Sequence, residues 1–505
     1  MPCTSTKSAP QTAGRVLALP LCSFLIIAAA SQICCLPFHP PRDPPYMMQF
    51  THAAVTAPPL YPNGHHGLGL GLFLDVGAPR ARPWPAAGSL FPTLPPSSKI
   101  SLGNLNSAGC MEQLLVHCAN AIEANDATLT QQILWVLNNI APADGDSNQR
   151  LTAAFLCALV ARASRTGACK AVTAAVAAAV ESAALHVHRF TAVELASFVD
   201  LTPWHRFGYM AANHAILEAV EGFSVVHVVD LSTTHCMQIP TLIDMLASRA
   251  EGPPILRLTV ADVGCSGPPP ALDMSYDELG AKLVNFARSR NVTMDFRMVP
   301  TSPADAFTSL VDQLRVQQLV SDGTEALILN CHMLLHTVPD ETAGSVSLTQ
   351  SVSLRTMLLK SIRTLDPTLV VVAEEDADFT AGDVVGRLRA AFNFLWIPYD
   401  AVDTFLPKGS EQRRWYEAEV GWKVENVLAQ EGVDRVERQE DRARWGQRMR
   451  GAGFRAVAFG EEAAGEIRTM LNEHAAGWGM KREDDDLMLT WKGHNVVFAS
   501  AWAPS

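Results

Sequence analysis

The sequence predicts an α/β fold in which a mainly parallel sheet carries helices on both faces. From residue 221 onward, short continuous apolar runs alternate with helical stretches, which is typical of strands covered on both sides. Over residues 107–220, by contrast, apolar residues recur at helical spacing and no strand is indicated. We therefore expect a helical cap over 107–220 and an α/β core over 221–503, after an N-terminal region over 1–106.

The N-terminal region is expected to be disordered. Pro, Gly and Ala crowd residues 37–100, and such a composition removes backbone donors and buries little apolar surface. The earlier segment 16–36 is apolar and follows Lys7 and Arg15, a pattern typical of a secretory signal. A Met47-Met48 pair offers a second start site, in which case residues 1–46 are an extension introduced by the gene model. The two starts predict different compartments.

The cap begins near residue 110 with apolar residues that recur every three or four positions. A further stripe over 151–160 and an alanine-rich helix to about residue 188 complete the block. Such stripes form either the core of a helical bundle or a surface that docks a partner chain. Under the second interpretation, the candidate partner-binding residues are Leu114, Leu115, Cys118, Ile122, Ile133 and Leu137.

The core alternates predicted strands with predicted helices. The strands lie at 225–230, 255–260, 293–299, 326–329 and 369–373, and the helices at 239–249, 276–289, 306–319 and 353–365. Later short strands at 455–459, 487–490 and 496–500 indicate an antiparallel hairpin edge. This order is similar to the Rossmann-like fold of methyltransferases, with helices on both faces of a parallel sheet.

Several segments resemble the motifs of one family, in the family's order, over about 107–503. The strand at 226–230, together with the helix start and the strand that follow it, resembles the VHIID motif of the GRAS family. One departure is Ile239, which stands where that family usually has Trp. The blocks 110–200 and 275–320 resemble its two leucine-rich regions, 371–403 its region named for Pro, Phe-Tyr and Arg-Glu residues, 435–440 its RVER motif, and the tail its SAW motif. The residues that carry the motifs are Val226, His227, Val228, Val229, Asp230, Gln238, Pro240, Arg257, Arg435, Val436, Glu437, Arg438, Trp478, Trp491 and Trp502.

The resemblance implies a nuclear regulator of plant transcription and development, of the scarecrow-like type, without enzyme activity or cofactor. The residues after Met47 resemble the start of a scarecrow-like member, and no acidic DELLA-type motif precedes the domain. The implied partners are other GRAS proteins, in homo- or heterodimers, and zinc-finger or other DNA-binding factors. The net charge of −12 argues against a broad DNA-binding surface on the chain itself. We therefore expect contact with promoter DNA mainly through partners, with sequence-specific DNA binding by the chain itself as an open alternative, and no contact with a membrane.

An S-adenosylmethionine-dependent methyltransferase is the alternative function. Asp230 ends the first strand and Asp262 follows the second, where such enzymes place acidic residues. The loop between strand and helix should be rich in glycine so that the backbone can approach the cofactor, yet 231–236 reads Leu-Ser-Thr-Thr-His-Cys. A secreted protein is a third interpretation, and the true start site would distinguish it.

Other chemical candidates are weaker. His332 and His336 have a spacing that metal ligands use on a helix, but no third ligand is evident. The acidic group at 374–378 is interpreted as a solvated, partner-facing loop rather than a cation site. The arginine run at 435–450, interrupted by three carboxylates, is interpreted as a charged helix face rather than a DNA grip. The 11 cysteines lack any C-x-x-C pair, which fits free thiols in a reducing compartment.

Overall fold

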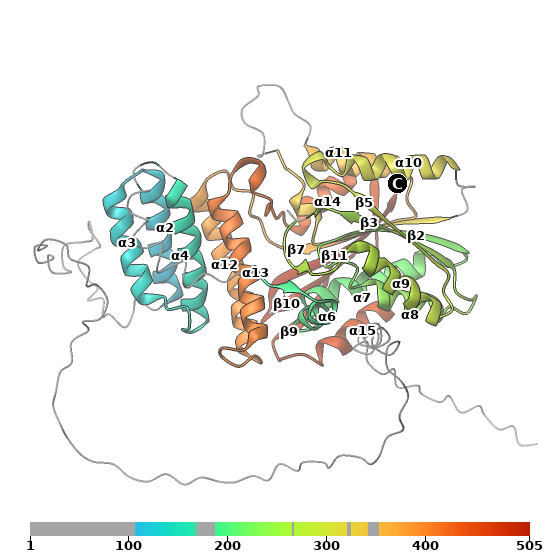
Figure 1. Cartoon of the computed structure of the whole chain (residues 1–505), viewed down its shortest axis with the longest axis horizontal. Helices are drawn as coiled ribbons and strands as arrows, with labels where there is room; N and C mark the ends of the chain where they lie inside the picture. The colour runs from blue at the N-terminus through green and yellow to red at the C-terminus, as the bar shows by residue number, and fades with distance from the viewer. Residues whose placement is uncertain are drawn as a thin grey trace, which may run out of the picture. The chain divides into compact units, whose positions relative to one another are not determined.

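A computed structural model describes residues 107–165, 167, 169, 187–264, 267–320, 325–341 and 353–505 (Figure 1). The predicted tail, its signal-like segment, the Met47-Met48 start and most of the alanine-rich helix lie outside these described residues. The fold below therefore concerns the predicted cap and core.

The sheet has the strand order β5-β3-β2-β6-β7-β11-β10-β9, with β8 also pairing with β11. The first five strands in that order are mutually parallel, and β11 lies antiparallel between β7 and β10. This is the predicted Rossmann-like, methyltransferase-type arrangement, with an antiparallel hairpin after the parallel part. The strands are β2 (Val225–Ser232), β3 (Ile255–Asp262), β5 (Met294–Pro300), β6 (Ala326–His332), β7 (Leu369–Glu375), β8 (Phe454–Val457), β9 (Trp478–Glu483), β10 (Asp486–Trp491) and β11 (His494–Pro504).

Every strand predicted in the core is present; five of the eight are two or three residues longer than expected, and β11 is six residues longer. The edge strand β9 and the short parallel pair β1 (Arg189–Phe190) and β4 (Ala271–Leu272) were not predicted. Side chains along β2 alternate between two apolar clusters, with Val226 and Val228 in one and Val229 and Leu231 in the other. Both faces of the sheet are therefore buried, as the continuous apolar runs predict.

Helices cover each face of the sheet (Figure 1). One cluster joins the sheet to α7 (Pro203–Ala219), α8 (Ile239–Ala247), α9 (Tyr276–Ser289) and α15 (Glu461–Leu471), and the other joins it to α10 (Thr308–Val320), α11 (Leu354–Arg363) and α14 (Arg442–Gly451). Helix α9 begins where the sequence predicts. Ser275 caps it, because its hydroxyl accepts a hydrogen bond from the backbone N–H of Glu278. Short 3-10 turns lie at η4 (Pro303–Asp305), η5 (Leu335–Thr337) and η6 (Gly432–Asp434).

The helical cap differs from the predicted block 107–220. Its first helices are α2 (Ala108–Glu123), α3 (Ala127–Ile140) and α4 (Ser147–Arg165), and two later helices, α12 (Val384–Asp403) and α13 (Glu411–Ala429), pack against them (Figure 1). Arg150 on α4 joins them, with its guanidinium 2.9 Å from Glu417 and 2.6 Å from Asp403. The predicted boundary between cap and core at residue 220 is also wrong. Helix α7, which follows the short α6 (Ala192–Val199), lies before residue 220 but packs on β7 and β11 of the core.

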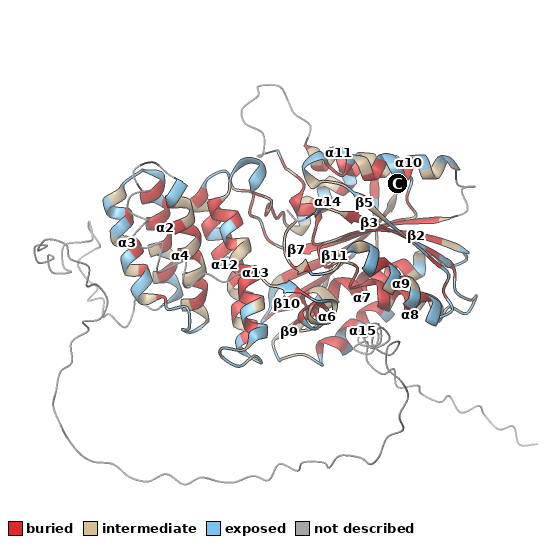
Figure 2. Cartoon of the chain, in the orientation of Figure 1, coloured by how far each residue is buried: buried red, intermediate tan, exposed pale blue. Residues whose placement is uncertain are grey.

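The predicted partner-binding stripe of the cap lies largely inside it. Leu115, Cys118, Ile122 and Leu137 are fully buried, while Leu114 and Ile133 are half-buried and pack against the same core (Figure 2). These residues hold α2, α3 and α4 together, so the four buried ones are not available to a partner. This burial favours the bundle-core interpretation of the stripe.

Candidate functional site

The carboxyl ends of the parallel strands are where open α/β sheets bind ligands. Asp230, near the end of β2, is buried there and accepts hydrogen bonds from Ser232 Oγ at 2.7 Å and Asn330 Nδ2 at 2.8 Å. Burial raises the pKa of Asp230, against these hydrogen bonds, which lower it. Both carboxylate oxygens therefore already have partners from the protein.

The loop after β2 is filled by its own side chains. His235 and Cys236 both adopt positive φ angles, of 49° and 62°, which glycine would adopt without strain. The His235 ring bonds to the Tyr276 hydroxyl at 2.9 Å and to the carbonyl oxygen of Pro270 at 3.0 Å, and Cys236 is fully buried. The backbone of this loop is thus covered where a methyltransferase would leave it bare for the methionine end of its cofactor.

The rest of the VHIID-like segment is also structural. Val226, Val228 and Val229 lie in the core, and the His227 ring bonds to Thr259 Oγ1 at 2.9 Å on the neighbouring strand. Gln238 donates to Asn213 at 2.9 Å and accepts from Asn330 at 3.0 Å. Pro240 lies in the first turn of α8, and the half-exposed Arg257 pairs with Glu325. These contacts join β2, β3, β6 and α7 rather than form a surface.

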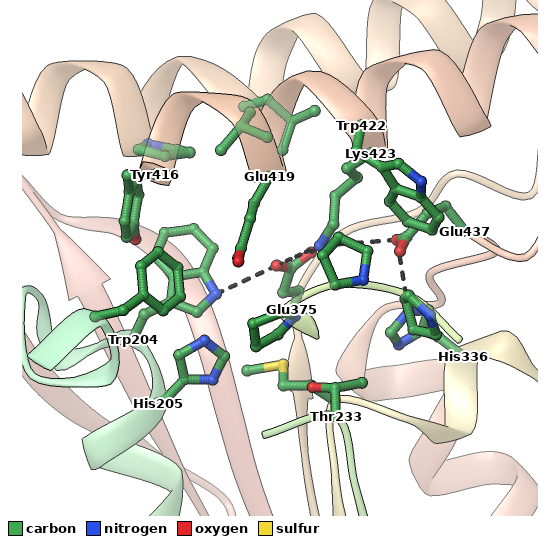
Figure 3. Close-up of a pocket in the computed structure, with 18 residues that line it drawn as sticks. Trp204, His205, Thr233, His336, Glu375, Tyr416, Glu419, Trp422, Lys423 and Glu437 are labelled. Atoms are coloured by element: carbon green, nitrogen blue, oxygen red, sulfur yellow. Dashed lines mark hydrogen bonds and ion pairs between the residues drawn. The ribbon is translucent and has the colours of Figure 1, made fainter. Parts of the chain in front are cut away.

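A partly open cavity of about 80 Å³ lies over the ends of β2, β6 and β7, and α7, α12, α13 and the prolines 268–270 border it (Figure 3). Lys423 on α13 donates to both carboxylate oxygens of Glu375, at 2.6 and 2.7 Å. The Trp204 indole N–H also reaches Glu375, at 3.2 Å. The cavity therefore combines aromatic walls with a group of buried charges.

The acidic group 374–378 is not the solvated loop that the sequence predicts. Glu374 and Glu375 belong to β7 and are buried, and only Asp378 is exposed. Asp376 accepts from the backbone N–H of Arg442 at 2.9 Å and from Asn495 at 2.8 Å. Burial is possible because each of these three inner carboxylates has a cation or a hydrogen-bond donor beside it.

His332 and His336 are placed apart rather than on one helix. The His332 ring lies 3.2 Å from His205, and burial lowers the pKa of both rings, so both are neutral and share one hydrogen bond. His336 lies in η5 between Glu374, at 2.8 Å, and Glu437, at 3.5 Å. Burial alone would lower the pKa of His336, but the two carboxylates outweigh it and raise the pKa to about 9. Among the described residues, no group of three His, Cys, Asp or Glu side chains is arranged to hold a metal ion.

The RVER-like segment is internal, which corrects the interpretation of 435–450 as one charged helix face. Arg435, Glu437 and Arg438 are buried and precede α14, and Val436 donates its backbone N–H to Asn426 at 2.8 Å. Arg438 pairs with Asp340 at 3.0 Å. Burial tends to raise the pKa of Glu437, yet Lys423 and His336 outweigh it and lower the pKa to about 2. The motif therefore supplies part of the charge network that borders the cavity.

The tryptophans of the SAW-like tail pack into the core of the sheet. Trp491 and Trp502 are buried in opposite clusters of the sheet, and Trp478 packs half-buried beside Trp491 with ring centroids 4.8 Å apart. The Trp491 indole donates to Asp400 at 2.7 Å and the Trp502 indole to Ser500 at 2.8 Å. These residues contribute to the packing of the fold.

Sequence reasoning missed the residues that make the cavity, above all Trp204, Glu419 and Lys423. Glu419 and Lys423 are four residues apart on α13, a helix that was not predicted, and Trp204 begins α7 behind the Thr202 cap and Pro203. The Thr-Pro pair was the one signal that could have marked the start of α7. None of the described helices is both long and apolar enough to cross a bilayer.

The chain is similar to known proteins over most of its length. A model of the GRAS domain family matches residues 111–503. The chain is 56% identical to Scarecrow-like protein 32 of Arabidopsis thaliana over 82% of this chain and 98% of that protein, and 33% identical to Protein SHORT-ROOT 1 of Oryza sativa subsp. japonica over 78% and 68%. The crystal structure of SCL7 from Oryza sativa has the same fold, with a TM-score of 0.60 and 23% identity over 78% of this chain and 99% of that one.

Proposed function

This chain belongs to the GRAS family of plant transcriptional regulators, and we propose that it acts in the nucleus by assembling with DNA-binding proteins rather than by holding DNA itself. Its expected partners are other GRAS proteins and zinc-finger or other DNA-binding factors. Under this proposal the chain has no enzymatic activity. It contributes a regulatory surface, and a partner contributes the contacts to bases.

The main support for this proposal is that most arginines of the densest arginine run are buried or paired with carboxylates. A protein that binds DNA places arginines where phosphates can reach them. In the densest arginine run of this chain, Arg435 and Arg438 are buried. Three others pair with carboxylates: Arg442 with Asp486 at 3.0 Å, Arg444 with Asp378 at 3.4 Å, and Arg448 with Glu440 at 2.6 Å. These side chains are committed to the protein, and the chain as a whole carries a charge of −12.

The outer face of α3 is the part of the cap best suited to a protein partner. Trp135 is 65% exposed and Leu129 is 41% exposed, on a helix whose opposite side is buried through Leu134 and Leu137. Tryptophan is enriched among the residues that dominate binding energy at interfaces. We assign partner docking to this face, in place of the buried stripe.

DNA binding measured against salt tests the proposal. Fluorescence anisotropy of the full chain on promoter duplexes and on scrambled duplexes should show weak binding without sequence preference near physiological salt. Adding a purified zinc-finger partner should produce selective binding, with a log–log salt slope of about −0.9 for each phosphate contact of the partner. Nanomolar, sequence-selective binding by the chain alone would make it a direct DNA-binding factor instead.

A further inference from the structure

We propose that the cavity over the ends of β2, β6 and β7 binds a small organic cation, a primary alkylammonium, which pairs with the Glu419 carboxylate (Figure 3). This site is independent of the transcriptional role proposed above. It rests on Glu419, whose carboxyl group forms no ion pair among the described residues, unlike those of Glu375 and Glu437, and has a buried oxygen without a hydrogen-bond partner.

Glu419 differs from the other carboxylates of the cavity. It leaves α13 one turn before Lys423 and points into the cavity, as Figure 3 shows. Its Oε1 atom is closed off from solvent and has no hydrogen-bond partner among the described residues. Glu375, by comparison, forms an ion pair with Lys423 at 2.6 Å. Glu437 lies 3.5 Å from His336 and 3.7 Å from Lys423. The two cations of the cavity are therefore already engaged, and Glu419 is left over.

The electrostatics of the empty cavity favour the uptake of a positive charge. Burial raises the pKa of Glu419 well above its ordinary value, and the charge of Lys423 opposes this only in part. This shift favours the protonated form of Glu419 when the cavity is empty. An ammonium group that displaces this proton gains a charge-assisted hydrogen bond inside a shielded site. Of the other titratable groups here, His205 is neutral, with a pKa lowered by burial to about 3, and His336 is charged beside its two carboxylates.

The residues that line the cavity and its volume determine which organic group can accompany the ammonium. Tyr416, Val420, Leu395 and Pro398 also line the cavity and offer apolar contacts. The cavity, at about 80 Å³, is smaller than the roughly 150 Å³ that holds a benzene ring. A short aliphatic chain fits this space and a nucleoside does not. The site therefore suits an alkylamine of a few carbons, either free or as the end of a lysine side chain.

Calorimetry on the full chain tests the site with three probes of equal size. Propylammonium should bind saturably at neutral pH, and 1-propanol and propionate should bind about tenfold more weakly or worse, because a hydrogen bond to a charged group contributes more than a neutral one. Titration in two buffers of different ionisation enthalpy should show that binding releases a proton. Equal affinity for propylammonium and 1-propanol, or binding without proton release, would overturn the proposal.

A pair of variants on α13 localises the effect. Glu419→Gln should lower the affinity for propylammonium by about tenfold or more, while Glu425→Gln, at an exposed position of the same helix, should leave it unchanged. Unchanged affinity in Glu419→Gln would refute the assignment. Should that variant fail to fold, the ammonium-over-alcohol preference of the unmodified chain decides. Tighter binding of Nα-acetyl-lysinamide than of propylammonium would support the site and favour a lysine side chain over a free alkylamine as its ligand.

Discussion

Lys423 donates hydrogen bonds to both carboxylate oxygens of Glu375, at 2.6 and 2.7 Å, and so ties a cap helix to the end of strand β7. We predict that Lys423→Met lowers the free energy of unfolding by about 3–5 kcal/mol, because Glu375 and Glu437 would lose their shared cation while still buried. Urea denaturation followed by circular dichroism measures this. Lys360→Met, on the exposed side of α11, should change stability by no more than about 0.5 kcal/mol. Equal effects of the two substitutions would contradict the role of the ion pair.

His336 should make stability depend on pH on the alkaline side. Its pKa is about 9 in the folded chain and about 6.5 in an unfolded one, so its stabilisation is complete below pH 6.5 and is lost as the pH rises through 9. The loss should be on the order of 3 kcal/mol. Unfolding at pH 6.5 and pH 9.5, compared between the native chain and His336→Gln, isolates this contribution. A difference between the two proteins that stays constant across this range would be inconsistent with a charged His336.

Two substitutions in the cap should separate its core from its surface. Leu115→Asp places a charge in the fully buried core of α2, and should unfold the cap at a cost of roughly 3 kcal/mol or more. Trp135→Ala, on the exposed face of α3, should leave circular dichroism and melting unchanged but weaken assembly by about 2 kcal/mol. Light scattering after size exclusion reads out assembly. Intact complexes in Trp135→Ala would move the docking surface elsewhere.

The filled loop after β2 predicts that the chain does not bind S-adenosylmethionine. The side chains of His235 and Cys236 occupy the space beside the loop, and Asp262 accepts from the backbone N–H of Gly264 at 2.9 Å. Calorimetry with the cofactor at millimolar concentration should therefore show no binding heat. Micromolar affinity would support the methyltransferase alternative, which the strand order by itself allows.

Local sequence patterns predicted an element correctly where all of its residues share the same surroundings. The central strands β2, β6 and β7 are buried on both faces, so their apolar runs stand out in the sequence. Helix α13 escaped because it packs on α4 of the cap and also borders the cavity, so its apolar residues do not gather on one side. Helix α12 carries Pro398 in its interior, which in a sequence indicates a break. Strand β9 is a half-exposed edge and carries little apolar signal.

The charged residues of the site could not have been placed from the sequence. Runs such as 435–440 and 374–378 are rich in charge, and charge ordinarily indicates solvent. Their burial depends on partners far along the chain: Arg438 meets Asp340, and His336 meets Glu374 and Glu437. Only the fold brings these opposite charges together, so the sequence of one segment alone does not indicate that its charged residues are buried.

The position of β11 has a consequence for how the chain is made. This strand, at His494–Pro504, lies between β7 and β10 and also pairs with β8. During synthesis the parallel half of the sheet therefore emerges with the edge of β7 open, and it stays open until residue 504 has left the ribosome. An open apolar edge of this kind invites pairing with other chains. We therefore expect a nascent chain of this protein to need chaperones while residues 376–504 are made, and a chain that stops before β11 to aggregate rather than act as a shortened regulator.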